Sequence, residues 1–450
     1  MKHPEHRGVS LGTITMLGLT LVVLVTCLCV LPQLMGKVNL NLADLAMSSS
    51  VNLNDSLPEL TMADIPIANV TQTPAALETP LPASESPVPT VVIETASPTP
   101  ITGGSVSLTF GGSIVMDDAT RKSGYDSDLE QYDYSEELSL IADDLDSDMT
   151  FVTLESVIDP SGNVRRMPNA PDNVLDMLAG ANVDVVALGY NRAADLGFES
   201  LQSTVAQAQG RGLETIGAYA SADDAKRLRI FTINNVRVGY LHYTNVIEST
   251  GKRKLESEDA SFALPTAVIG SPELIAGDVI RLRQEGAQIV IVSINWSGSS
   301  KFSTTSTKRK TFMQTIADAG ADVIVGSGTK SVREVSWIMG NRDDGTTRQT
   351  LCAWSWGSLL NGERKDGNVA GMLLHLQMSF NGSSVSFERV SYTPTYIWRY
   401  KQDNAYRYRV VASDLTPPDA MDDSQADNAA RAFENLKKSL GDSPINLRTK

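Results

Sequence analysis

The segment DVVALGYNRAADLGFESL, residues 184–201, joins a short apolar run to a polar loop and then to a stretch with helical spacing. The run Val-Val-Ala-Leu does not alternate between apolar and polar positions, which is typical of a strand buried on both faces of a parallel sheet. The loop GYNRAAD, residues 189–195, begins at the glycine where this strand stops. Because ligands collect beyond the carboxyl ends of strands in such sheets, the loop is a candidate site.

The same order of helix, glycine, buried strand and polar loop recurs along the chain. It is found at residues 171–189, 271–296 and 308–328, and further strands are predicted at 106–112, 149–156, 350–358 and 367–380. Asn234 and Asn235 separate two alternating runs, which predicts a β-hairpin. Helices that alternate with buried strands predict an α/β fold with right-handed crossovers.

Composition limits the kinds of function that the chain can have. It has 450 residues, enough for one large or two ordinary domains, and a formal net charge of −15. That charge argues against nucleic acid, whose phosphates would be repelled. With three cysteines, two of them in an apolar N-terminal run, no disulfide framework is expected. Only four histidines are present, which restricts metal and acid–base chemistry.

The N-terminus predicts a membrane anchor. Residues 11–31, LGTITMLGLTLVVLVTCLCVL, contain no charged side chain and are long enough to span a hydrocarbon core of ~30 Å. Lys2 and Arg7 precede this run, so the positive-inside rule places residues 1–10 in the cytoplasm. The expected location is therefore the cell membrane, with a single pass and the globular part outside.

Residues 38–104 are rich in Pro, Thr, Ser and Ala and carry only acidic charges, which predicts a disordered stalk. A globular domain is expected from 105 to 397, including a helix at 135–145 with Leu138, Ile141 and Leu145 on one face. The remaining residues, 398–450, are expected to form a loosely ordered tail with one amphipathic helix, about 422–440.

Six predicted strand ends carry polar or glycine-rich loops, at residues 111–118, 153–156, 189–195, 295–299, 326–330 and 356–363. Their order and spacing resemble the blocks G-D-I-M, F-x-N-L-E, A-N-N-H-x-x-D-x-G, H-W-G-x-E, G-A-D-x-V-I-G-H-H-P-H and S-L-G-N-F. These blocks are those of the CapA family of poly-γ-glutamate capsule synthesis proteins, in the calcineurin-like metallophosphoesterase superfamily. The resemblance covers residues 105–397 and implies a metallophosphoesterase-like β-sandwich flanked by helices.

The scaffold part of each block is retained. The matching residues are Gly112, Glu155, Asn191, Asp195, Gly197, Trp296, Gly320, Ala321, Asp322, Gly326 and Gly357. Three of the polar ones also have purely structural interpretations, in which Asn191 forms a tight turn, Glu155 braces loops and Asp195 caps a helix. Trp296 is interpreted as either a packing residue or an aromatic wall of a cleft.

The metal-binding part of each block is replaced. Ser113 occupies the position of an Asp in the family blocks. Asn positions are occupied by Thr153, Tyr190 and Ser358. His positions are occupied by Arg192, Asn295, Ser327, Gly328 and Lys330. A two-metal hydrolytic site needs carboxylate and imidazole ligands, whereas hydroxyls are weak ligands and protonated Arg or Lys repels a cation. The sequence therefore predicts no catalytic residue, no bound metal and no other cofactor, and the chain is expected to be a pseudoenzyme.

The first functional hypothesis is a non-catalytic, membrane-anchored protein that binds an anionic cell-surface polymer. The resemblance implies a role in capsule, poly-γ-glutamate or envelope assembly. Arg192 and Lys330 are expected to converge on one cleft and to pair with polymer carboxylates. The candidate cleft residues are Arg192, Lys330, Asn191, Glu155, Asn295, Trp296, Ser113 and Ser327.

Two alternatives remain open at this point. One is a metal-dependent hydrolase with rearranged ligands such as Asp117, Asp118 and Glu155. The other is a structural envelope subunit that docks another protein. The expected partners are accordingly a surface polymer, polyglutamate or glycan, or an envelope protein, together with the membrane through the N-terminal anchor.

Overall fold

The computed structural model describes residues 103–164, 167–296, 305–343, 345–413 and 417–448, all within one compact unit of residues 93–450. The predicted anchor and all but the last two residues of the predicted stalk lie outside the described residues. Within the described ranges, no helix is both long enough and apolar enough to cross a membrane.

The larger of two main sheets contains nine strands. Its order is β16 (Ala405–Ala412), β15 (Val385–Gln402), β14 (Ala370–Phe380), β1 (Gly104–Ile114), β4 (Met149–Leu154), β5 (Val185–Ala187) and β6 (Glu214–Ile216), with β13 (Ser358–Leu360) beside β1 and β17 (Asn446–Leu447) beside β15. Strands β1, β4, β5 and β6 are parallel, whereas β14, β15 and β16 are antiparallel. Three of the predicted loops, at residues 111–118, 153–156 and 189–195, lie at the ends of β1, β4 and β5 in the parallel half.

The second sheet contains six strands. Its order is β11 (Val335–Asn341), β12 (Thr347–Ala353), β10 (Val323–Ser327), β9 (Ile289–Asn295), β8 (Val236–Thr244) and β7 (Arg229–Ile233). The four central strands are parallel and the two edge strands are antiparallel. A separate two-stranded hairpin pairs β2 (Tyr125–Asp126) with β3 (Gln131–Tyr132).

The two sheets pack face to face through an aromatic core. Phe110 stacks on Phe151 with ring centroids 4.9 Å apart and on Trp356 at 5.6 Å, and Phe151 meets the edge of Tyr240 at 4.7 Å. Each of these rings is fully buried, so the packing stabilises the sandwich beyond the area it removes from water. Two of these rings, on β1 and β4, come from strands that also end at candidate loops.

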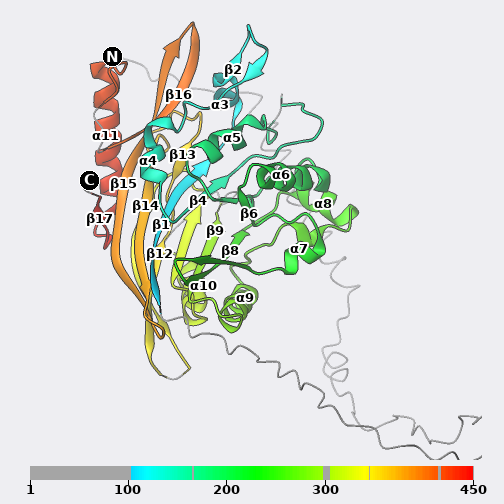
Figure 1. Ribbon diagram of the computed structural model, residues 1–450, viewed down its shortest axis with the longest axis vertical. Coiled ribbons are helices and arrows are strands. Elements are labelled where there is room, and N and C mark those ends of the chain that lie inside the picture. Colours follow the sequence, from blue (N-terminus) through cyan, green and yellow to red (C-terminus); the bar gives the residue numbers. More distant parts are fainter. Residues whose placement is uncertain (1–102, 165–166, 297–304, 344, 414–416, 449–450) are drawn as a thin grey trace, which may run out of the picture. The chain divides into compact units, whose positions relative to one another are not determined.

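Helices cover the outer faces of the sandwich (Figure 1). Helices α5 (Asn173–Gly180) and α6 (Phe198–Gly210) pack on the larger sheet, and α9 (Glu273–Gln284) and α10 (Thr307–Asp318) on the smaller one. The other helices between β1 and α9 are α3 (Asp118–Ser123), η1 (Ser139–Ile141), α4 (Ala142–Leu145), α7 (Ala222–Lys226), α8 (Ser249–Ser257) and η2 (Ser261–Ala263). The predicted α/β arrangement of helices flanking a sandwich is therefore confirmed.

Two local predictions can be compared directly with the structure. Asn234 and Asn235 have φ of 48° and 64°, the left-handed values that a tight hairpin turn requires, so the predicted hairpin is confirmed. The helix predicted at 135–145 is shorter and splits into η1 and α4. Its three apolar residues are nevertheless all buried.

The domain continues past the boundary predicted at Ile397, which falls inside β15. Asp403 and Asn404, with φ of 49° and 60°, turn the chain into β16. Arginine and lysine alternate with aromatic residues in both strands, so the apolar alternation is hard to recognise. These cations cover aromatic rings, as where the Arg399 guanidinium lies 4.3 Å from the Tyr406 ring centroid.

The predicted C-terminal helix corresponds to α11 (Asp423–Leu440). Asp422 and Gln425 form a capping box at its start, and Gly441 follows its end. Its buried residues, among them Ala432 and Leu436, pack against β14 and β15 in the cluster that also fills the sandwich. Helix α11 is therefore part of the domain and not of a loose tail.

Candidate functional site

The strand register brings the replaced ligand positions side by side. Ser113 near the end of β1 is paired with Thr153 on β4 and with Ser358 on β13. In the second sheet, Asn295 at the end of β9 is paired with Ser327 at the end of β10. The backbone N–H of Gly328 donates to Ser113 Oγ at 3.3 Å, which joins the two sheets at this edge.

Glu155 lies at the centre of this corner. Asn295 Nδ2 donates to Glu155 Oε1 at 3.0 Å and to Ser327 Oγ at 3.2 Å. Burial raises the pKa of the Glu155 carboxyl, while hydrogen bonds from Asn295 and Ser113 and the charge of Lys330 lower it. Glu155 thus braces the loops, as its structural interpretation predicts.

Three buried hydroxyls around this corner have no hydrogen-bond partner among the described residues. They are Thr153 Oγ1, Tyr190 Oη and Ser358 Oγ, which all stand at positions where the family blocks have Asn. Burial and the nearby charge of Glu155 raise the pKa of Tyr190 well above its ordinary value. Such hydroxyls are costly to bury without a partner, so the corner has the polarity of a ligand site.

Each predicted cleft cation has an acidic partner within the domain. Arg192 Nε lies 2.8 Å from Asp195 Oδ2, and Arg192 Nη2 donates to the Met167 carbonyl at 3.5 Å. Lys330, whose φ is 63°, forms an ion pair with Glu363. The two side chains are 41% and 33% exposed, so an external anion would compete with these partners. Asp195 therefore binds Arg192 and does not cap α6, whose N-cap is Gly197.

The remaining two predicted residues face other neighbours. Asn191 Nδ2 donates to Glu248 Oε1 at 3.0 Å, on the loop before α8. Trp296 is 1% exposed and packs edge-to-face on Phe312 in the core beneath α10. Its alternative role as a wall of the cleft is thus not seen, because the ring is buried. Residues 297–299 of the same predicted loop lie outside the described residues.

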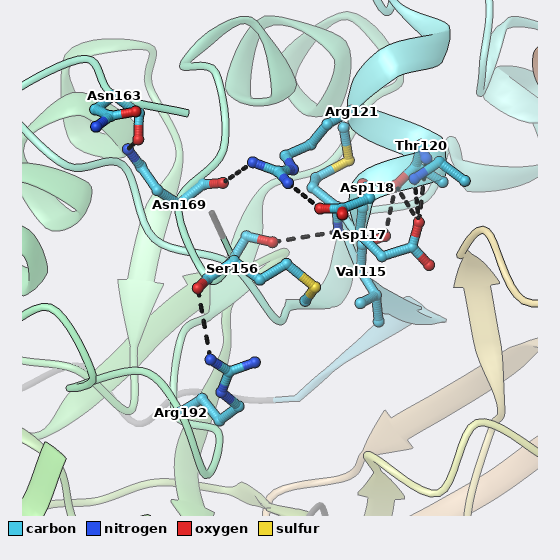
Figure 2. A network of polar contacts seen from close by, with 12 residues as sticks. Val115, Asp117, Asp118, Thr120, Arg121, Ser156, Asn163, Asn169 and Arg192 are labelled. Atoms are coloured by element: carbon cyan, nitrogen blue, oxygen red, sulfur yellow. Dashed lines mark hydrogen bonds and ion pairs between the residues drawn. The ribbon is translucent and has the colours of Figure 1, made fainter. Parts of the chain in front are cut away.

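The acidic residues considered for a rearranged metal site have other partners. Asp117 accepts hydrogen bonds from the backbone of Ala119 and Thr120 at the start of α3, and from the Gly362 N–H at 2.8 Å. Asp118 pairs with Arg121, which also reaches the Asn169 carbonyl at 3.4 Å (Figure 2). These carboxylates therefore stabilise α3 and its neighbouring loops.

His242, at the end of β8, is buried and has hydrogen-bond partners on both ring nitrogens. Nε2 lies 2.8 Å from the Gly189 carbonyl and Nδ1 lies 2.6 Å from Ser293 Oγ. Burial lowers the pKa of His242 to about 4, so the ring is neutral near pH 7. It ties β8 and β9 to the loop that opens with Gly189. His242 is thus a core residue whose hydrogen-bonding groups have partners.

The donor set does not fit the two-metal site that the family resemblance implies. Among the described residues at these strand ends, the corner offers one carboxylate, that of Glu155, an amide that presents its N–H₂ group to that carboxylate, and several hydroxyls. Two close divalent ions need several carboxylate or imidazole ligands. Within the described ranges, no group of three or more His, Cys, Asp or Glu side chains is placed to hold a metal ion.

Glu363 is a site residue that sequence reasoning missed. It accepts from Lys330 and, through Oε2, from Asn368 Nδ2 at 2.7 Å. These contacts lower the pKa of Glu363, the hydrogen bond from Lys330 being the largest cause. The only available signal was an opposite charge at the end of another predicted loop, which does not identify a pair by itself.

The fold and the corner define a class: an α/β sandwich whose polar site lies at the carboxyl ends of parallel strands of both sheets. A family model described as "Bacterial capsule synthesis protein PGA_cap" matches residues 107–363, more than half of the chain. The chain belongs to this family, and the family expected from the sequence blocks is confirmed.

Curated relatives resemble the chain over part of their length. A protein named "PGA biosynthesis protein CapA" from Bacillus subtilis is 26% identical over 151 residues, 33% of this chain and 37% of that protein. A "Probable polyglutamine synthesis accessory protein" of Mycobacterium tuberculosis is 28% identical over 204 residues, 43% of this chain and 53% of that protein. The chain thus spans about half or less of the length of these relatives.

Among solved structures, the calcineurin-like phosphoesterase YfkN from Bacillus subtilis is similar with a TM-score of 0.38 and 12% sequence identity. The alignment covers 75% of this chain and 98% of that structure.

Proposed function

We propose that this chain is a non-catalytic accessory protein of capsule or polyglutamate assembly, held at the outer face of the membrane, which binds an anionic polymer. The observation that carries the proposal is the hydrogen bond from Asn295 Nδ2 to Glu155 Oε1. The Asn295 amide thus occupies the Glu155 carboxylate with a hydrogen bond inside the protein, where a metalloenzyme would use such a carboxylate as a metal ligand. The family membership and the names of the relatives support the link to capsule and polyglutamate.

The hydrolase alternative rests on one feature, the raised pKa of Glu155. Perturbed carboxyl groups in polar corners are frequent at active sites, although internal hydrogen-bond networks perturb them as well. The two functions differ in what Glu155 does, since a hydrolase needs its carboxylate for the reaction whereas an accessory protein needs only its hydrogen bond. Glutamine in place of Glu155 keeps an oxygen that can accept from Asn295.

The first test measures metal content and hydrolysis. The purified full chain should carry no stoichiometric Mn, Fe or Zn by mass spectrometry. It should hydrolyse neither a phosphodiester nor polyglutamate, and Glu155→Gln should leave its binding of short γ-linked oligoglutamate unchanged. Metal-dependent turnover that disappears in Glu155→Gln would establish the hydrolase and reject the proposal. An inert protein with no affinity for any anionic polymer would instead favour the structural subunit.

The second test concerns the anchor at residues 11–31. A chain held by one apolar span should stay in the membrane fraction after high-salt and alkaline washes and be released by detergent. Protease added to intact cells should degrade the globular part if it faces outward. Release by salt, or a mature chain that starts after the apolar run, would contradict the anchored form.

A further inference from the structure

A pocket of about 210 Å³ lies between α11, the loop that follows β13 and the β15 strand. Figure 1 shows α11 lying along β15. Its polar lining includes Arg364, Asp366, Tyr396, Asn428, Arg431 and Asn435. Sites that enclose a whole drug-sized ligand occupy ~300–1,000 Å³, so this pocket suits a small part of a longer molecule.

The two arginines of this pocket differ from Arg192 and Lys330, because neither has an acidic partner among the described residues. Arg364 donates through Nη1 to the Ile397 carbonyl at 2.9 Å and through Nη2 to Tyr396 Oη at 3.2 Å. Arg431 binds the side-chain oxygen of Asn428. Within the described part of the chain, neither guanidinium forms an ion pair with Asp or Glu. With Asp366 as the one acidic lining residue, the pocket has a surplus of one positive charge.

The rest of the lining suits a peptide-like chain. Asn428 and Asn435 lie seven positions apart on α11, so both amides face the same side of the helix. Their amide groups can donate to and accept from peptide groups. Ala432 and Leu436 also line the pocket and supply apolar contact for methylene groups. The hydrogen-bond partners of Arg364 and Arg431 are neutral and use only some of the N–H groups of each guanidinium. The other N–H groups can donate to a carboxylate.

The pocket lies next to the candidate site, and most of its lining lies outside the shared part of the family. The family match ends at Glu363, so Arg364 and all of α11 lie beyond it. Ser331 at the rim binds Asn368 at 2.9 Å, Asn368 binds Glu363, and Glu363 pairs with Lys330. A chain held in the pocket would therefore pass close to the polar corner.

We infer that this pocket binds carboxylate groups of an acidic polyamide, one or two residues at a time, through Arg364 and Arg431. The inference rests on the proposed function and identifies where, and through which groups, the polymer would bind. The asparagine pair favours a γ-glutamyl chain, with its regular amides, over a polyuronate, which carries carboxylates without them.

The test measures binding of a fluorescent short γ-linked oligoglutamate to the full chain by fluorescence anisotropy. The double variant Arg364→Gln/Arg431→Gln should raise the Kd about tenfold or more, because it removes the charge-assisted hydrogen bonds. The parent affinity should fall as salt is raised, and an oligomer with amidated carboxyls should not bind. Both arginines are exposed, so the variant should keep the circular dichroism spectrum and Tm of the parent.

Arg253→Gln is the matched control. Arg253 is another exposed arginine without an acidic partner in the described chain, and its Nε donates to the Ser249 carbonyl on α8, far from α11 (Figure 1). This variant should bind like the parent. A parent that binds oligoglutamate while the double variant binds equally well would overturn the pocket and leave the proposed function standing. Arginine-dependent binding of oligogalacturonate alone would overturn the polyamide assignment. A parent that binds neither would reject polymer binding altogether.

Discussion

Replacing Asp322 by alanine should lower the free energy of unfolding by about 3–5 kcal/mol, the cost of breaking a buried ion pair by removing one partner. Asp322 is 1% exposed and lies 2.5 Å from Arg283 Nη2 and 3.2 Å from Arg348 Nη1. It also accepts from the Val290 N–H at 2.8 Å, at the start of β9. The variant leaves two mostly buried guanidinium groups facing each other without an anion between them.

Urea denaturation followed by tryptophan fluorescence measures this effect. The matched control is Asp223→Ala, which breaks an exposed pair with Lys226 whose side chains are 94% and 76% exposed. Such pairs contribute about 0–1 kcal/mol, so this variant should unfold close to the parent. Equal stabilities for the two variants would show that the contacts of Asp322 with Arg283, Arg348 and Val290 do not hold β9, β10 and α9 together.

Stability should fall as the pH rises from 6.5 to 8, and Glu137→Gln should remove most of this dependence. Glu137 is 4% exposed, and burial raises its pKa from 4.5 to about 8, although a backbone hydrogen bond, the Arg407 charge and the Ser123 hydroxyl lower it. Between these values the folded chain keeps a proton that the unfolded chain has released. Raising the pH through this window therefore favours unfolding, by on the order of 2 kcal/mol between pH 6.5 and 8.

The measurement uses pH 6.5 to 8 because, at lower pH, His242 makes the stability of the fold rise with pH, opposite to the effect of Glu137. Its pKa falls from 6.5 to about 4 in the fold, so its contribution to stability rises with pH and is complete above 6.5. Comparing parent and variant at each pH isolates Glu137. The control Glu199→Gln alters an exposed carboxyl on α6 and should keep the parent profile. A Glu137→Gln profile parallel to that of the parent would refute a protonated Glu137.

The sequence predicted the parts of the site that depend on local pattern. Unbroken apolar runs identified the buried strands, glycines marked their ends, and six polar loops in a given order indicated the family. The replacement of His and Asp positions by Ser, Asn, Arg and Lys could be recognised position by position. The hairpin at Asn234 and Asn235 was equally local, because a left-handed turn depends on the residues that form it.

Partnerships between distant residues were decided by the tertiary structure. Asn295 meets Glu155 across 140 positions, and Lys330 meets Glu363 across 33, because strand register and loop geometry bring them together. Lys330 was expected to be available to a polymer carboxylate, but in the structure its charge is paired with that of Glu363. The sequence pattern around Lys330 does not indicate which acidic residue will lie beside it in the fold.

The C-terminal region shows the same division. Its helix was predictable from amphipathic spacing. Strand β16 was not predicted, because its arginines interrupt the apolar pattern. Only the structure shows that arginine side chains of this region lie over aromatic rings. The pocket of Arg364 and Arg431 exists only because α11 packs against β14 and β15. Secondary structure follows from short-range backbone and side-chain preferences, but a binding pocket requires long-range packing that local sequence does not specify.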